Sequence, residues 1–118
     1  MVIRQDHGPV TRLILNRPDA MNALDPDLLG ELDVHVRSVA DDPTVRVVVI
    51  TATGRAFCAG ADLKAVLGAE GVLDAARMLG FERQARATFA RVAALTKPTI
   101  AVLNGITMAG GPGARTAL

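Results

Sequence analysis

The sequence predicts an α/β protein built around a parallel β-sheet. Two apolar runs rich in β-branched residues, 45–51 and 99–103, have the composition of strands buried on both faces. Segments with the apolar spacing of helices precede and separate these runs. Strands that alternate with helices form βαβ units, in which successive strands run parallel. With 118 residues, the chain has the size of one domain.

The chain is expected to open with a β-hairpin. Residues 2–6 and 10–15 are two short apolar runs, and the Gly8-Pro9 pair between them is typical of a tight turn. The polar segment 16–19 ends the second run. The sequence therefore predicts a pair of strands ahead of the βαβ units.

A helix is predicted to begin at Pro26. Asp25 is a favourable N-cap, and proline suits the first helical position because its missing N–H would have no helical partner there. The segment 41–43 (Asp-Asp-Pro) should end this helix. His35 lies off the apolar face and is interpreted as a solvated surface histidine. The buried face should consist of Leu28, Leu29, Leu32, Val36 and Val39.

A second helical stretch should occupy residues 73–95. Before it, residues 52–62 are rich in small side chains and are predicted to be a tightly packed loop. A helical region should begin near Leu63 and break near Gly68 and Gly71. The apolar face of the long helix should contain Met78, Phe81, Ala85, Phe89 and Val92, and Lys97-Pro98 should lie beyond its end.

Composition excludes several classes of protein. Lys and Arg number 13 and Asp and Glu number 12, so a net charge of +1 offers no attraction to nucleic acid or to an anionic membrane. Aromatic residues make up 3%, which argues against a base-stacking surface. The single cysteine, Cys58, cannot form an internal disulfide, and no Cys/His cluster has metal-site spacing. The charged first residues and the absence of a long apolar run predict a cytoplasmic protein without a signal peptide or membrane span.

Two loops of small residues follow the two apolar strands. The first is 58–62 (CAGAD) and the second is 109–111 (AGG). In open α/β sheets, ligands bind beyond the carboxyl ends of the strands, so these loops face each other if the strands are neighbours. Two backbone N–H groups could then point at one oxygen and form an oxyanion hole. The alternative is that both loops are only tight turns.

Three segments resemble the crotonase superfamily, the enoyl-CoA hydratase/isomerase family. They are LNRPDAMNAL (15–24), VITATGRAFCAGADLK (49–64) and KPTIAVLNGITMAGG (97–111), and they occur in family order. The resemblance covers nearly the whole chain to about Gly113. It implies a crotonase-like ββα spiral, of which residues 1–118 are the N-terminal half of the core domain, with the C-terminal part absent.

The resemblance also implies a function. The family binds acyl-CoA thioesters and stabilises an enolate at the thioester carbonyl. Its two oxyanion N–H donors match Ala61 and Gly110. The residues that match its CoA-binding segment are Ala61, Asp62, Leu63 and Lys64, and coenzyme A is part of the substrate, so no further cofactor is implied. Complete members assemble as homotrimers or as dimers of trimers.

Other roles stand beside these for individual residues. Asp62 is interpreted as a helix N-cap rather than an acid, because aspartate is a favoured cap. Cys58 is interpreted as a small buried residue rather than a nucleophile. Lys64 either meets a CoA phosphate or is a solvated surface lysine. Ala61 and Gly110 could serve only in packing.

The sequence departs from the hydratase pattern in its acid–base residues. Gly113 stands where hydratases have a glutamate after the second glycine motif, and the chain ends before the family's other acid–base position. Enzyme activity therefore stays open, and the expectation is a truncated member with little hydratase or isomerase activity. The alternative is a non-catalytic acyl-CoA-binding or assembly module. Titratable candidates within the chain are Asp62, Glu70 and Glu82.

Overall fold

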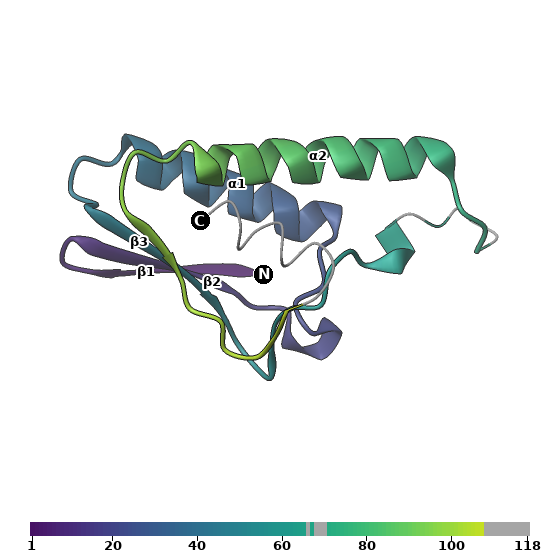
Figure 1. Cartoon of the computed structure of the whole chain (residues 1–118), viewed down its shortest axis with the longest axis horizontal. Helices are drawn as coiled ribbons and strands as arrows, with labels where there is room; N and C mark the ends of the chain where they lie inside the picture. Colours follow the sequence, from purple (N-terminus) through teal and green to yellow (C-terminus); the bar gives the residue numbers. More distant parts are fainter. Residues whose placement is uncertain (66, 68–70, 108–118) are drawn as a thin grey trace.

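Two helices lie together over one face of a four-stranded sheet (Figure 1). The computed structural model describes residues 1–65, 67 and 71–107. The sheet has the strand order β1-β2-β3-β5, in which β1 pairs antiparallel with β2 and the other pairs are parallel. These strands are β1 (Val2–His7), β2 (Val10–Leu15), β3 (Val47–Ala52) and β5 (Thr99–Ala101). The predicted parallel α/β sheet is confirmed.

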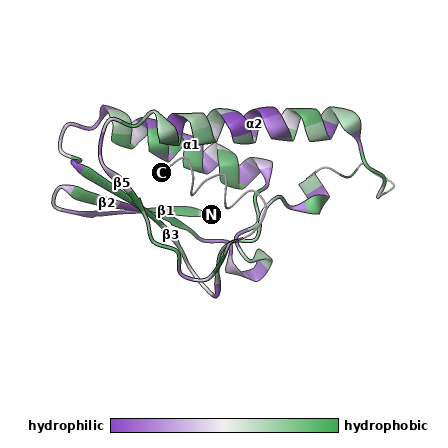
Figure 2. Cartoon of the chain, viewed as in Figure 1, coloured by the Kyte–Doolittle hydropathy of each residue, from purple (hydrophilic) through white to green (hydrophobic). Residues whose placement is uncertain are grey.

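The predicted hairpin and first helix are both present. The hairpin pairs Val2 with Leu15 and closes at the Gly8-Pro9 turn. Helix α1 (Pro26–Asp41) begins where predicted, because the Asp25 carboxylate accepts a hydrogen bond of 2.8 Å from the Leu28 N–H. Its buried residues are the five that the spacing predicts: Leu28, Leu29, Leu32, Val36 and Val39. They pack against apolar residues of the sheet. Figure 2 colours the ribbon by the hydropathy of each residue.

Helix α2 (Ala75–Ala93) matches the predicted second helix but buries less of its apolar face. Val92 is buried, and Phe81, Ala85 and Phe89 pack against the core. Met78, the first residue of that apolar face, is 43% exposed. The reason is that the first half of α2 extends past the edge of the sheet (Figure 1). None of the described helices is long and apolar enough to cross a membrane.

A second, two-stranded parallel sheet pairs part of the predicted 52–62 loop with a segment for which the sequence predicted no strand. Its strands are β4 (Ala56–Cys58) and β6 (Ile106–Thr107). The prediction of a loop over 52–62 is therefore wrong at its centre, where all three β4 residues are buried. Three residues are too few to show an alternating pattern, and a strand this short is defined only by its distant partner. The small helix predicted near Leu63 is the short 3₁₀ turn η2 (Leu63–Ala65), and the break expected near Gly68 falls outside the described residues.

The strand predicted at 99–103 is shorter and more exposed than expected. β5 ends at Ala101, and Ile100 is 52% exposed. β5 is an edge strand of the described sheet, so burial on both faces is wrong for it. In β3, Val48 and Ile50 are buried while Val47 and Val49 are only half-buried. One face of the described sheet packs on the helices, and that face holds the core.

Candidate functional site

The strands β4 and β6, which precede the two small-residue loops in sequence, end at paired positions. Cys58, the last residue of β4, is the register partner of Thr107, the last residue of β6. Because the strands are parallel, the chain runs on from both at the same edge of the sheet. The two loops can face each other only if the strands before them are neighbours. The β3–β5 pair and the β4–β6 pair both meet this condition. Gly110 itself lies outside the described residues.

Ala61 is held in a one-residue parallel bridge to Leu24. The Leu24 N–H donates to the Gly60 carbonyl at 2.7 Å, and the Asp62 N–H donates to the Leu24 carbonyl at 2.8 Å. The Gly60 carbonyl and the Ala61 N–H belong to the same planar peptide group and point in opposite directions. Because the carbonyl faces Leu24, the N–H of Ala61 points away from Leu24. Within the described part of the chain, no group accepts a hydrogen bond from this N–H. Ala61 itself is exposed.

Gly60 makes the approach to this bridge possible. Its φ is 100°, a backbone conformation that glycine adopts without steric strain and that other residues rarely adopt. The residue before it, Ala59, donates its N–H to the Met21 carbonyl at 3.1 Å. The segment 59–62 is therefore fastened to residues 21–24 by three backbone hydrogen bonds.

Arg17 ties the same two segments together through its side chain. One guanidinium nitrogen, Nη1, donates to the Ala23 carbonyl at 2.9 Å, and Nη2 donates to Asp62 Oδ2 at 2.8 Å. Nη2 also lies 3.4 Å from Asp25 Oδ2. The side chains of Arg17, Asp62 and Asp25 are 24%, 15% and 18% exposed, so water screens these contacts only in part.

Asn22 fixes the turn beneath the site. It is fully buried, with φ of 54°, a left-handed conformation that asparagine tolerates better than most residues. Its amide nitrogen donates to the carbonyls of Thr53 and Ala56 at 2.8 and 2.9 Å, and its amide oxygen accepts from the Arg17 N–H at 2.7 Å. Asn104 Nδ2 also donates to the Ala56 carbonyl, at 3.2 Å. The two asparagines thus tie the turn at 17–22 and the residues just before β6 to Ala56 in β4.

Asp62 serves as a cap and an ion-pair partner. Its Oδ1 accepts from the Lys64 N–H at 3.0 Å at the start of η2, which agrees with its interpretation as an N-cap. Burial opposes the charged form, but the Arg17 and Lys64 hydrogen bonds outweigh it and lower the pKa of the carboxyl. A carboxylate kept ionised in this way is poorly suited to deliver a proton near neutral pH.

The other predicted residues fall into two groups. Leu63 is 71% exposed and Lys64 is exposed, both on the short turn that follows Ala61. Cys58 is buried, and burial raises the pKa of its thiol, so it is a packing residue as interpreted and not a nucleophile. Among the described residues, no cluster of His, Cys, Asp and Glu could hold a metal ion.

Arg17 and Asn22 were not predicted from the sequence as residues of the site. Both lie in the segment 15–24, which follows a predicted strand. Loops that follow strands often carry binding or catalytic residues. The partners of Arg17 and Asn22, Asp62 and Ala56, are separated from them by 45 and 34 residues, respectively. Local patterns do not reveal contacts of this separation.

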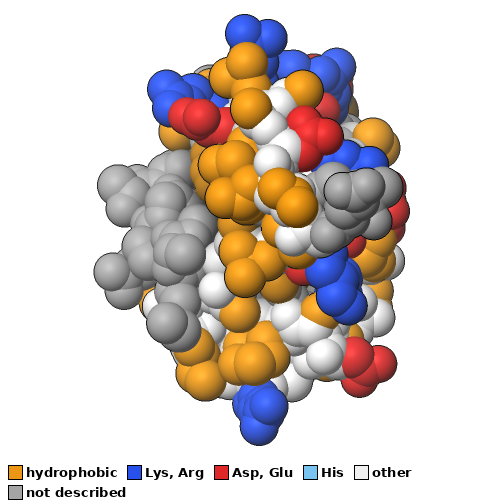
Figure 3. Space-filling model, turned by 90° about the vertical axis from the view of Figure 1, so that its right-hand side faces the viewer, with side chains coloured by type: hydrophobic (Ala, Val, Ile, Leu, Met, Phe, Trp, Pro, Cys, Tyr) orange, Lys and Arg blue, Asp and Glu red, His pale blue; other side chains and the backbone are white. Residues whose placement is uncertain are grey.

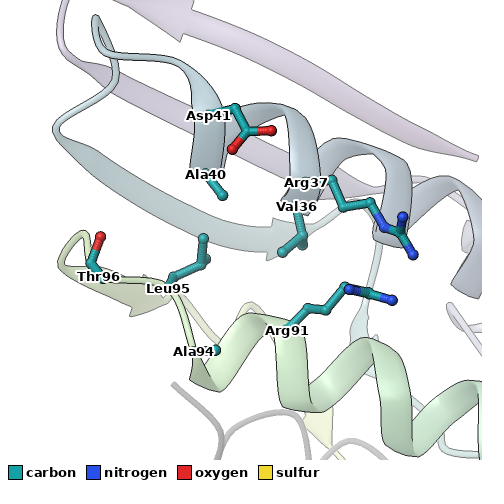
Figure 4. Close-up of a pocket in the computed structure, with 8 residues that line it drawn as sticks. All are labelled: Val36, Arg37, Ala40, Asp41, Arg91, Ala94, Leu95 and Thr96. Atoms are coloured by element: carbon teal, nitrogen blue, oxygen red, sulfur yellow. The ribbon is translucent and has the colours of Figure 1, made fainter.

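A groove also lies elsewhere, between the C-terminal parts of α1 and α2 (Figure 4). It measures about 510 Å³. Arg37 and Arg91 approach each other at its edge because both pair with Asp33, at 3.0 and 2.7 Å. The two guanidinium groups are therefore already paired with Asp33. The groove contributes no residue to the site around Ala61.

Known proteins match this chain along most of its length. The sequence model described as enoyl-CoA hydratase/isomerase matches residues 10–117. A crotonyl-CoA hydratase from Syntrophomonas wolfei is 36% identical over 93% of this chain and 41% of its own length. Mitochondrial 3-hydroxyisobutyryl-CoA hydrolase from Gallus gallus is 33% identical over 95% of this chain and 29% of its own length.

Solved structures give the same result. An enoyl-CoA hydratase from Bacillus anthracis matches with a TM-score of 0.89 and 31% identity, covering 98% of this chain and 44% of that one. The chain thus spans less than half the length of these relatives, and its fold is an N-terminal portion of the crotonase fold. Since the family's sequence model covers nearly all of it, the chain belongs to the enoyl-CoA hydratase/isomerase family.

Proposed function

We propose that this chain binds acyl-CoA thioesters and directs two backbone N–H groups, those of Ala61 and Gly110, at the thioester oxygen. The observation that carries the proposal is the Leu24–Ala61 bridge, which uses the Gly60 carbonyl and the Asp62 N–H and so turns the Ala61 N–H away from Leu24. Gly110 is the third residue after Thr107, as Ala61 is the third residue after Cys58. The equal spacing from paired positions supports a shared target for both donors.

The chemistry that this arrangement favours is enolate formation. When a nucleophile adds to the β-carbon of an α,β-unsaturated thioester, an electron pair moves to the thioester oxygen. Two N–H dipoles already aimed at that oxygen stabilise the charge as it develops, without the reorganisation that water requires. Coenzyme A is part of the substrate, so this step uses no separate cofactor.

The turn after Ala61 would hold the CoA portion. Asp62 caps η2, and the side chains of Leu63 and Lys64 that follow are exposed. The apolar surface of Leu63 suits a flat organic ring, and the Lys64 ammonium suits a phosphate. Asp62 would contribute its backbone to this segment, and its side chain would cap η2.

We further propose that the 118-residue chain turns over enoyl-CoA slowly on its own. The carboxylates beside Ala61 in the described structure, Asp62 and Asp25, are both paired with Arg17. General acid–base catalysis contributes about 10²–10⁴-fold in rate. The same observation favours the second candidate function, a non-catalytic acyl-CoA-binding or assembly module. Crotonyl-CoA hydration followed by absorbance separates the two: slow turnover above the enzyme-free rate supports the slow enzyme, and a rate equal to the enzyme-free rate supports the non-catalytic module. Ordinary enzymatic turnover would contradict both.

The binding proposal is tested with butyryl-CoA carrying ¹³C at the thioester carbonyl. Binding is measured by calorimetry, and the ¹³C resonance of the bound ligand is expected to move downfield as the carbonyl is polarised. Gly110→Pro removes one N–H and fixes φ at about −65°, so it should reduce the downfield shift of the ¹³C resonance. Gly110→Ala keeps the N–H and is the matched control. A folded Gly110→Pro variant with an unchanged shift would show that Gly110 is only a turn residue.

A further inference from the structure

One guanidinium holds both sides of the bridge that orients Ala61. Ala23, whose carbonyl accepts from Arg17 Nη1, immediately precedes Leu24. Asp62, whose carboxylate accepts from Arg17 Nη2, immediately follows Ala61. Arg17 is therefore bonded to the chain neighbour of each bridge residue. A slip or separation of the two segments would break at least one of these contacts, at 2.9 and 2.8 Å.

The same guanidinium meets the N-caps of two helical segments. Asp25 caps α1 through Oδ1 and presents Oδ2 to Arg17 at 3.4 Å. Asp62 bonds the start of η2 through Oδ1 and presents Oδ2 to Arg17 at 2.8 Å. Each carboxylate thus uses one oxygen for a cap and the other for the guanidinium. The planar fork of arginine can reach a carbonyl and a carboxylate together, which a lysine ammonium does less well.

The charge of Asp62 gives the contact a second consequence. Asp62 directly follows the residue proposed to donate to the thioester oxygen, and an unpaired carboxylate there would oppose negative charge on that oxygen. The Asp62 side chain is only 15% exposed, so water alone would screen its charge weakly. Arg17 supplies the compensating positive charge at 2.8 Å.

We infer that Arg17 is a positioning residue for the oxyanion site: it locks the Leu24–Ala61 bridge in register, so that the Ala61 N–H keeps its direction away from Leu24, and it neutralises Asp62. This inference rests on the proposed function. Arg17 touches neither the thioester nor the acyl chain in this account. It acts through Ala23 and Asp62.

The test uses the 118-residue chain with Arg17→Gln and Arg17→Lys. Arg4→Gln is the matched control, because Arg4 also pairs with two carboxylates, Asp6 and Asp42, and its side chain is 20% exposed. Amide hydrogen exchange is measured by NMR in the ligand-free chain at Leu24 and Asp62, relative to amides of the β2–β3 pair. The ¹³C shift of bound butyryl-CoA is measured in the same variants.

Arg17→Gln should speed exchange at Leu24 and Asp62 by about tenfold to a hundredfold relative to β2–β3, as expected for loss of a charged hydrogen-bond donor. Arg17→Lys should fall between this variant and the parent, and Arg4→Gln should leave the ratio unchanged. A purely structural role would accelerate all of these amides together. An unchanged ratio in Arg17→Gln, or a parental ¹³C shift in its bound ligand, overturns the inference.

The two proposals fail separately. If the parent chain binds no butyryl-CoA, the proposed function fails, and the ligand-free exchange ratio still decides whether Arg17 holds the bridge. If the parent binds and shifts the carbonyl resonance while Arg17→Gln does the same, the proposed function stands and the role of Arg17 is wrong.

Discussion

Gly105 lies against the β4 segment with no room for a side chain. A Cβ at this position would stand 2.0 Å from the Arg55 carbonyl oxygen, closer than any non-bonded contact allows. Gly105→Ala should therefore push β6 away from β4 and lower the free energy of unfolding by about 1–3 kcal/mol, the usual cost of overpacking. Urea denaturation measures the change.

Gly80→Ala is the control for this prediction. Gly80 lies within α2, and a Cβ there would meet no atom within 4 Å. Alanine favours the helix, so this variant should gain about 0.4–1 kcal/mol. Equal stability of the two alanine variants would contradict the close approach of Gly105 to β4.

At the scale of single residues, the sequence predicted the candidate loop but not the contacts that hold it. The small residues at 58–62 predicted a loop that a ligand can approach, and Ala61 does lie exposed there. The contacts that orient Ala61 come from Leu24 and Arg17, more than thirty residues earlier in the chain. Their role depends on strand pairing, which residue spacing within one segment cannot predict.

Helix α1 is fixed by charged groups at both ends. Asp25 caps its N-terminus, and the Lys97 ammonium donates to the carbonyls of Val39 and Asp42 at its C-terminus. A cation at this end also opposes the partial negative charge of the helix dipole. Lys97→Met should lower the free energy of unfolding by about 1.5–3 kcal/mol, since two carbonyls lose a charged donor.

The matched control is Lys64→Met, because Lys64 is exposed on a short turn. A surface substitution of this kind should change stability by less than about 0.5 kcal/mol. Thermal or urea unfolding of both variants gives the comparison. Equal effects would show that the Lys97 contacts contribute nothing to α1.

The turn after α1 gives a pH dependence. Hydrogen bonds from the Thr44 hydroxyl and N–H, and then from Arg4, lower the pKa of Asp42 to about 2, from an ordinary 3.8. Because the pKa is lower in the folded state, the stabilisation is complete above the unfolded value and is lost as pH falls toward 2. Asp42→Asn should flatten the fall in urea midpoint between about pH 4 and pH 2. An identical slope in parent and variant would refute this.

Among the elements, the helices were the most predictable. α1 follows from a local cap, a proline and an apolar stripe, all within sixteen residues of sequence. β4 and β6 were missed because strands of three and two residues carry no period of their own. The burial predicted for β5 was too high. An apolar composition does not reveal that a strand lies at the edge of the described sheet.

At the scale of the molecule, apolar side chains remain exposed on two sides. One set lies where α2 begins, and Figure 3 looks onto this end and shows apolar side chains gathered along it. The other set lies on and after β5. The first set contains Leu63, Val72, Leu73, Met78 and Leu79, and the second contains Ile100, Val102, Leu103 and Ile106.

Contiguous apolar surface of this kind favours association in water. The purified chain should therefore self-associate with rising concentration and bind a hydrophobic dye. Leu79→Glu, on the exposed face of α2, should reduce both. Sedimentation velocity is the measurement, and a monomer at all concentrations with one sharp, reversible calorimetric transition would contradict the prediction.

The central claim concerns one N–H group, and the amide resonance of Ala61 tests it most directly. Two-dimensional ¹⁵N–¹H NMR of the chain is recorded during titration with butyryl-CoA and, in parallel, with coenzyme A, which has no thioester carbonyl. Butyryl-CoA is expected to move the Ala61 amide proton downfield, as a new hydrogen bond requires, and coenzyme A is expected to leave it in place. An Ala61 resonance that stays in place while butyryl-CoA saturates the chain, or that moves equally with both ligands, would contradict the central claim.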